Sequence, residues 1–153
     1  MEDINDLNDK LHILLADDDE DDRHFFIEAV KDLNLLATVT VVNDGAQLMN
    51  YLTKNNLKPP MFIFLDINMP GKSGVKVLQE IKGNKDFKDI PVAMYSTSSS
   101  PVDIENAFTS GANAFIKKPS DFGVLKKVIT KAVSTKWLRP DSGLTRKNFL
   151  FHI

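Results

Sequence analysis

Short apolar runs alternate with amphipathic segments along the chain. The apolar runs have strand length and continuous hydrophobicity, which is typical of strands buried on both faces of a sheet. They cover residues 11–16, 37–42, 61–65, 91–95 and 114–116. The segments between them place apolar residues three and four positions apart, as amphipathic helices do. This alternation predicts an α/β fold with five βα units, in which helices cover both faces of a five-stranded parallel sheet.

Local signals set the ends of these elements. Asn43-Asp44-Gly45 and Pro70-Gly71 are predicted breaks between elements. Asp19 stands where a helix N-cap belongs, and residues 20–22 place three further acids in the first turn, where negative charge complements the helix dipole. Ser100 before Pro101 predicts the start of a later helix.

The composition is that of one ordinary globular domain. The chain has 153 residues, of which 42% are hydrophobic and 26% charged, and its net charge is −2. We expect a loose leader at 1–9, one folded domain at 10–138 and a tail at 139–153 with no output domain. The balanced charge and the shortness of the apolar runs argue against nucleic-acid binding and membrane insertion, so a cytoplasmic protein is expected. The absence of cysteine excludes disulfides and thiolate metal sites.

The residues that follow the strands carry the candidate chemistry. Asp17 and Asp18 follow the first strand, Asp66 the third, Ser96 ends the fourth and Lys118 follows the fifth. In open parallel sheets, ligands bind beyond the carboxyl ends of the strands. Three neighbouring carboxylates stay ionised when a cation offsets their repulsion, and an all-oxygen site suits Mg²⁺. A carboxylate beside such a metal can act as a nucleophile toward phosphorus.

Four blocks of the sequence, LLADDDEDDR, LDINMPGKSG, PVAMYSTS and GANAFIKKP, resemble in order and spacing the signature blocks of bacterial response-regulator receiver domains, the CheY-like superfamily. The resemblance covers residues 10–138. It implies a flavodoxin-like doubly wound sandwich with strand order 2-1-3-4-5. It also implies a single-domain response regulator of a two-component system, in which an aspartate takes a phosphoryl group from a histidine kinase.

The resemblance implies a role for each residue that matches the family's motifs. Asp66 would be the phosphoacceptor. Asp18 would bind Mg²⁺ directly and Asp17 through water, and Asn68 would offer its backbone carbonyl to the metal. Lys118, before an expected cis Pro119, would contact the phosphoryl group.

Three further positions complete the implied machinery. Ser96 would be the hydroxyl that moves toward the phosphoryl group, and Phe115 would be the aromatic switch residue that then turns inward. Asn68 and Thr97 occupy positions that tune hydrolysis of the acyl phosphate. The implied chemistry is self-phosphorylation and self-dephosphorylation rather than enzymatic turnover.

The implied partners are a sensor histidine kinase or a histidine phosphotransfer protein, so the chain is expected to be either an output or a relay link. A downstream protein would bind the face of the fourth helix, fifth strand and fifth helix, and a second copy of the chain is a further candidate partner. The alternative function is an aspartyl-phosphate phosphohydrolase of the haloacid-dehalogenase type. That family needs Thr or Val where this chain has Asp21. A flavodoxin-like electron carrier is disfavoured because six consecutive acids would repel a flavin phosphate.

Overall fold

A computed structural model describes residues 11–54, 58–134 and 150–151 of the chain. The strands are β1 Leu11–Ala16, β2 Ala37–Val42, β3 Phe62–Leu65, β4 Val92–Ser96, β5 Ala114–Lys117 and β6 Leu150–Phe151. The helices are α2 Glu20–Asp32, α3 Gly45–Lys54, α4 Gly74–Lys82, α5 Pro101–Thr109 and α6 Phe122–Ser134. Among these described helices, none has the length and apolar character needed to cross a bilayer. The predicted leader, residues 10, 55–57 and 135–138 of the predicted domain, and most of the predicted tail lie outside the described residues.

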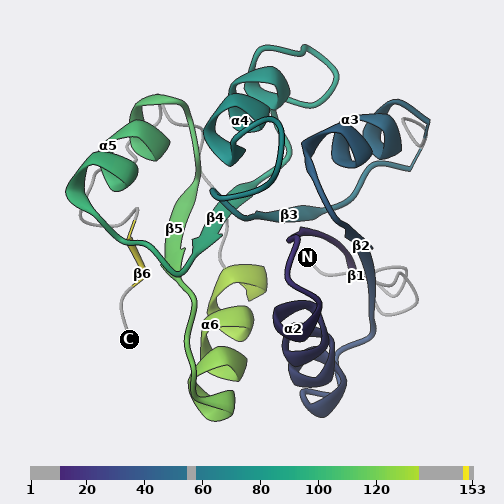
Figure 1. Ribbon diagram of the computed structural model, residues 1–153. Coiled ribbons are helices and arrows are strands. Elements are labelled where there is room, and N and C mark those ends of the chain that lie inside the picture. The colour runs from purple at the N-terminus through teal and green to yellow at the C-terminus, as the bar shows by residue number, and fades with distance from the viewer. Residues whose placement is uncertain (1–10, 55–57, 135–149, 152–153) are drawn as a thin grey trace.

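The strands form one parallel sheet with the order β2-β1-β3-β4-β5-β6 (Figure 1). The predicted order of the first five strands is confirmed. The sequence did not predict β6, which pairs with β5 so that Phe115 lies opposite Leu150 and Ile116 opposite Phe151. A strand of two residues has no periodicity that a sequence pattern could reveal. It falls within the segment 139–153, which we expected to be a tail.

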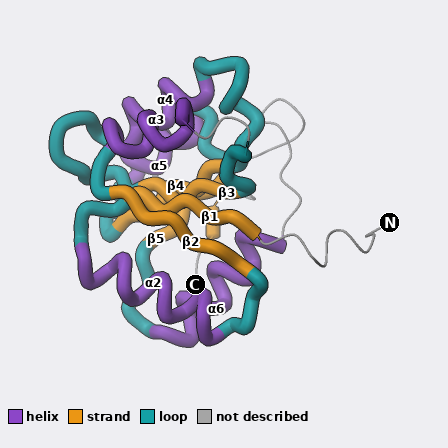
Figure 2. Tube along the Cα trace, turned by 90° about the vertical axis from the view of Figure 1, so that its right-hand side faces the viewer, coloured by secondary structure: helices purple, strands orange, loops and turns teal. Residues whose placement is uncertain are grey.

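Helices cover both faces of the sheet. Helices α2 and α6 lie on one face, and α3, α4 and α5 lie on the other (Figures 1 and 2). Side chains of a strand alternate between faces, so Ile13 and Leu15 of β1 belong to the apolar cluster with α2 and α6, whereas Leu14 and Ala16 belong to the cluster with α3, α4 and α5. All four are fully buried. Burial on both faces is the reason why the strands have continuous apolar sequences.

The predicted helix caps are confirmed. The Asp19 carboxylate accepts a hydrogen bond from the Asp22 backbone N–H at 3.0 Å and so caps α2, whose first turn contains the three acids that follow. The Ser100 hydroxyl accepts one from the Asp103 N–H at 3.2 Å and caps α5. Both helices begin at the carboxyl edge of the sheet, so each cap also shapes a loop at that edge.

Candidate functional site

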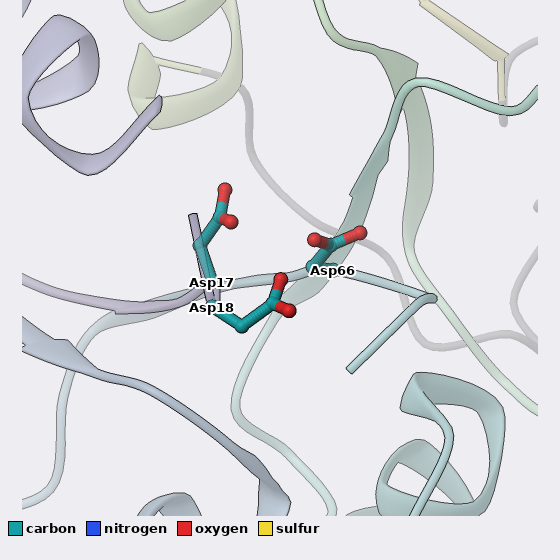
Figure 3. Close-up of side chains that lie close together, drawn as sticks. All are labelled: Asp17, Asp18 and Asp66. Atoms are coloured by element: carbon teal, nitrogen blue, oxygen red, sulfur yellow. The ribbon is translucent and has the colours of Figure 1, made fainter. Parts of the chain in front are cut away.

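The predicted acids meet at the carboxyl ends of β1 and β3, which are neighbouring strands. Ala16 lies opposite Leu65, so Asp17 and Asp66 leave the sheet at the same level. The Asp66 N–H donates to the Ala16 carbonyl at 3.0 Å and continues the pairing past the end of β3. Figure 3 shows Asp17, Asp18 and Asp66 gathered at this edge. The register of two buried strands therefore brings together acids that are about fifty residues apart.

These three acids could hold a divalent cation. One carboxylate oxygen from each lies within 4.8 Å of the others. Asp17 is fully buried, Asp66 is 5% exposed, and Asp18 is open to solvent. The buried Asp17 Oδ2 meets Lys118 as an ion pair, yet it receives no hydrogen bond from the described residues. A buried oxygen with an unused lone pair beside two other carboxylates fits Mg²⁺, which takes oxygen ligands and keeps several waters.

Lys118 is surrounded by carboxylates. Its Nζ lies 2.8 Å from Asp17 Oδ2, 2.9 Å from Asp22 Oδ2 and 3.3 Å from Asp66 Oδ2. The lysine side chain is only 8% exposed. Its backbone N–H donates to the Ser96 carbonyl at 2.8 Å, which fixes the start of the loop after β5. The predicted meeting of Lys118 with the acids is therefore observed, with Asp22 as an additional member.

At both Asp66 and Lys118, burial and the opposite charge of neighbouring side chains shift the pKa in opposite directions. Burial raises the pKa of Asp66 to about 6, Lys118 counteracts this, and the neighbouring Asp17 carboxylate adds to the rise. Burial would lower the pKa of Lys118, but its close contacts with the Asp17 and Asp22 carboxylates raise that pKa above its ordinary value. The lysine is therefore a fixed positive charge, whereas ionised Asp66 carries a cost that a cation would relieve.

The loop between β1 and α2 is held by contacts to Asp17. The Asp19 N–H donates to Asp17 Oδ1 at 3.0 Å, and Arg23 Nη1 donates to the Asp17 carbonyl at 2.8 Å. Asp17 therefore uses one carboxylate oxygen inside its own loop and presents the other to Lys118. Sequence reasoning did not find this role of Arg23, because a single basic residue near the start of a helix has no distinctive pattern.

The loop after β3 holds Asp66. The Asn68 N–H donates to Asp66 Oδ1 at 3.3 Å, whereas the Asn68 side chain is exposed. The Gly74 N–H donates to the Ile67 carbonyl at 2.8 Å and brings the start of α4 against this loop. A Cβ atom at residue 74 would overlap the Asp66 carbonyl oxygen and lie 2.8 Å from Ile67 Cα. Only glycine permits this close approach of α4 to the backbone of Asp66 and Ile67.

The predicted switch and tuning residues occupy different environments. Ser96 is fully buried at the end of β4, and its Oγ accepts a hydrogen bond from the Ser98 N–H at 3.1 Å. Thr97 is exposed. Phe115 is fully buried in the cluster with α3, α4 and α5. The Phe115 ring is therefore already inward in this structure, and its role as a switch stays a prediction.

Two further outcomes differ from expectation. We interpreted Asp22 only as a first-turn acid of a helix, and it is one, but it also pairs with Lys118. Nothing in the sequence distinguishes it from Asp21 in this respect. The expected cis bond before Pro119 was wrong, because every peptide bond among the described residues is trans. The trans form is the more stable one for an X–Pro bond by about 0.5–1 kcal/mol unless packing imposes the other.

The doubly wound sheet, the acid cluster and the lysine at its carboxyl edge together define a receiver domain. The family model for the response regulator receiver domain matches residues 13–130. The chain belongs to this family. It is therefore a signalling domain of the two-component type rather than a conventional enzyme, and the phosphohydrolase alternative loses its support.

Individual relatives agree with this assignment. The chain is 31% identical over 130 residues to response regulator Rcp1 of Synechocystis, and the match covers 82% of this chain and 88% of the relative. It is 30% identical over 125 residues to chemotaxis protein CheY-3 of Vibrio cholerae, covering 82% and 93%. Among solved structures, the phosphorylated cyanobacterial phytochrome response regulator RcpA has a TM-score of 0.77 and 32% identity, covering 84% and 97%. The Mn²⁺-bound form of Rcp1 has a TM-score of 0.75 and 29% identity, covering 83% and 97%.

Proposed function

We propose that the chain accepts a phosphoryl group on Asp66 from a phosphohistidine, with Mg²⁺ bound at Asp17 and Asp18. The donor would be a sensor histidine kinase or a histidine phosphotransfer protein, and the reaction would take place in the cytoplasm. The observation that carries this proposal is the double environment of Asp66. Its carboxylate lies within 4.8 Å of oxygens from Asp17 and Asp18, and also 3.3 Å from the ammonium of Lys118.

Related structures support the two halves of this proposal. One similar receiver is described as phosphorylated and another as Mn²⁺-bound. Here, Asp17, Asp18 and Asp66 would hold the metal, with the Asn68 backbone carbonyl as a further ligand. A bound Mg²⁺ would neutralise the carboxylates and the charge that develops on the transferring phosphoryl oxygens.

The residues of the chain prepare the transfer. The Asn68 N–H holds Asp66 Oδ1, and Lys118 faces Oδ2, so the carboxylate is fixed before the donor arrives. A carboxylate oxygen of Asp66 attacks phosphorus in line with the bond to the histidine nitrogen. The new O–P bond forms as the N–P bond breaks, and the electron pair of that bond returns to the histidine nitrogen. A donor that is protonated on its other ring nitrogen then leaves as a neutral imidazole. Lys118 stabilises the oxygens of the transferred group.

The signal would then pass along β4 and β5. Ser96 ends β4 and Phe115 lies in β5, and these strands are paired, with Met94 opposite Phe115. A move of the Ser96 hydroxyl toward the phosphoryl group changes the packing available to Phe115, and the face formed by α5, β5 and α6 shifts in population. A downstream protein, a relay partner or a second copy of the chain would read that face. Thr97, exposed beside Ser96, would slow hydrolysis of the acyl phosphate by limiting access of water.

Intact-mass measurement tests the proposed function. The protein is incubated with acetyl phosphate in the presence of Mg²⁺ or of a chelator. We expect the added mass of one phosphoryl group only with Mg²⁺, and none in Asp66→Asn. Asp86→Asn is a matched control because Asp86 is an exposed acid on the loop after α4. Retention of the Mg²⁺-dependent mass in Asp66→Asn, or its absence from the unmodified chain, would contradict the proposal.

A further inference from the structure

Asp22 gives Lys118 a third acidic partner, in a place where the phosphoacceptor and a metal ligand supply the other two. Asp22 Oδ2 lies 2.9 Å from Lys118 Nζ, which is closer than the 3.3 Å between Lys118 and Asp66. Asp22 belongs to the first turn of α2, and Lys118 follows β5, ninety-six residues later in the chain. The contact therefore joins the start of a helix to the lysine that we expect to receive the phosphoryl oxygens.

The ammonium group of Lys118 already lies within 3.3 Å of three carboxylate oxygens. A lysine ammonium has three N–H donors. Three carboxylates surround it, from Asp17, Asp22 and Asp66. A phosphoryl group on Asp66 brings new anionic oxygens that compete for the same donors. One carboxylate must then loosen its contact with Lys118, or the phosphoryl group must share an occupied donor.

The burial of the three partners decides which one loosens. The side chains of Asp17 and Asp66 are 0% and 7% exposed, whereas that of Asp22 is 37% exposed. A carboxylate that leaves its cation inside the protein keeps the full cost of burial, whereas one at the surface regains water. Asp22 also lies in the first turn of α2, where the helix dipole stabilises negative charge after the lysine has gone. Asp22 is the partner whose release costs least.

We propose that Asp22 is a positioning residue that holds Lys118 in the unphosphorylated chain and gives it up to the phosphoryl group. This inference rests on the proposed function of Asp66. The competition between Asp22 and the phosphoryl oxygens for Lys118 sets how readily the site is phosphorylated. The Asp22 carboxylate therefore biases the equilibrium toward the unphosphorylated state, and its removal frees the lysine for the incoming group.

The test is the affinity for beryllofluoride, which mimics the phosphoryl group, at saturating Mg²⁺. Asp22→Asn is compared with Asp21→Asn. Asp21 lies in the same turn of α2, is exposed and has no described contact with Lys118. Its replacement by Asn therefore removes the same charge without changing the surroundings of the lysine. We expect Asp22→Asn to bind beryllofluoride about tenfold more tightly, the effect of one charge-assisted hydrogen bond. We expect Asp21→Asn to remain within about twofold of the unmodified chain, as a solvated charge should.

Each outcome bears on the proposal. An equal effect of both variants would show a general field of negative charge, and weaker binding by Asp22→Asn would show that Asp22 aims Lys118 at the acceptor; either result overturns the proposal. Asp22→Glu, which keeps the charge, should restore the original affinity. A purely structural role predicts changes in thermal stability without this order of affinities. If the unmodified chain binds no beryllofluoride with Mg²⁺, the proposed function itself fails. If it binds beryllofluoride but Asp22→Asn changes nothing, only the proposed role of Asp22 is refuted.

Discussion

Replacement of Asp66 by Asn should stabilise the protein when Mg²⁺ is absent. Burial raises the pKa of Asp66 from 3.8 to about 6, so the folded state holds the proton more tightly than the unfolded chain does. The stability linked to this group is fully present below the unfolded pKa and is lost as the pH rises through the folded value. Above about pH 6, the ionised carboxylate therefore weighs against folding.

The magnitude follows from the size of the shift. A change of about two units corresponds to about 3 kcal/mol at most, since one unit is about 1.4 kcal/mol. Asparagine keeps an acceptor for the Asn68 N–H but loses the attraction between Asp66 and Lys118, so we expect a net gain of about 1–2 kcal/mol near pH 7.5. For a chain of this size, the midpoint of thermal unfolding should rise by about 3–6 °C.

The assay is thermal or urea unfolding of the unmodified chain and Asp66→Asn in a chelator, between about pH 4 and pH 8. The advantage of the variant should shrink as the pH falls through 6 and vanish near the unfolded pKa. Added Mg²⁺ should stabilise the unmodified chain more than the variant, because the cation offsets the same repulsion. Asp86→Asn serves as the control for loss of an exposed acid. A variant that is less stable at neutral pH, or an advantage that is independent of pH, would refute the reasoning.

Further changes test other parts of the structure. Gly74→Ala should destabilise the fold by more than about 2 kcal/mol and impair phosphorylation by acetyl phosphate, because the added methyl overlaps the Asp66 carbonyl oxygen. Urea unfolding measures the loss of stability, and intact mass measures the phosphorylation. Asp18→Asn should weaken Mg²⁺ binding at least tenfold, as seen by calorimetric titration, while thermal stability in chelator is kept or raised, since Asp18 is exposed and its charge opposes Asp66. Asn113→Ala should cost about 2–3 kcal/mol in urea unfolding, because the buried Asn113 Oδ1 accepts a hydrogen bond from Lys82 Nζ at 3.1 Å; loss of less than about 0.5 kcal/mol would contradict this role.

The sequence predicted the positions of Asp17, Asp66 and Lys118 well because their placement follows from strand register. Each residue immediately follows a buried strand, and parallel strands bring such positions to one edge. The apolar runs locate the strands, and the resemblance to receivers supplies their order. The prediction that these residues lie close together therefore does not depend on their side-chain conformations.

Contacts that depend on side-chain reach could not be predicted in this way. Asp21 and Asp22 have the same charge, the same helix turn and neighbouring positions, yet only Asp22 reaches Lys118. Successive residues of a helix point about 100° apart around its axis, so only one of the two faces Lys118. The strand β6 was missed for a different reason, since two residues contain too little pattern to signal a strand.

The pairing of β6 with β5 determines what kind of recognition this side of the sheet allows. An edge strand offers unpaired N–H and C=O groups, which an extended peptide can bind by adding a strand of its own. In the described structure, β5 has β4 on one side and β6 on the other, so its backbone at Phe115 and Ile116 is already paired. A partner of the proposed face of α5, β5 and α6 would therefore reach the β5 backbone at these two residues only by displacing β6, and would otherwise recognise side chains. The pairing of β5 with β6 thus favours partners that recognise side chains over partners that add a strand to β5.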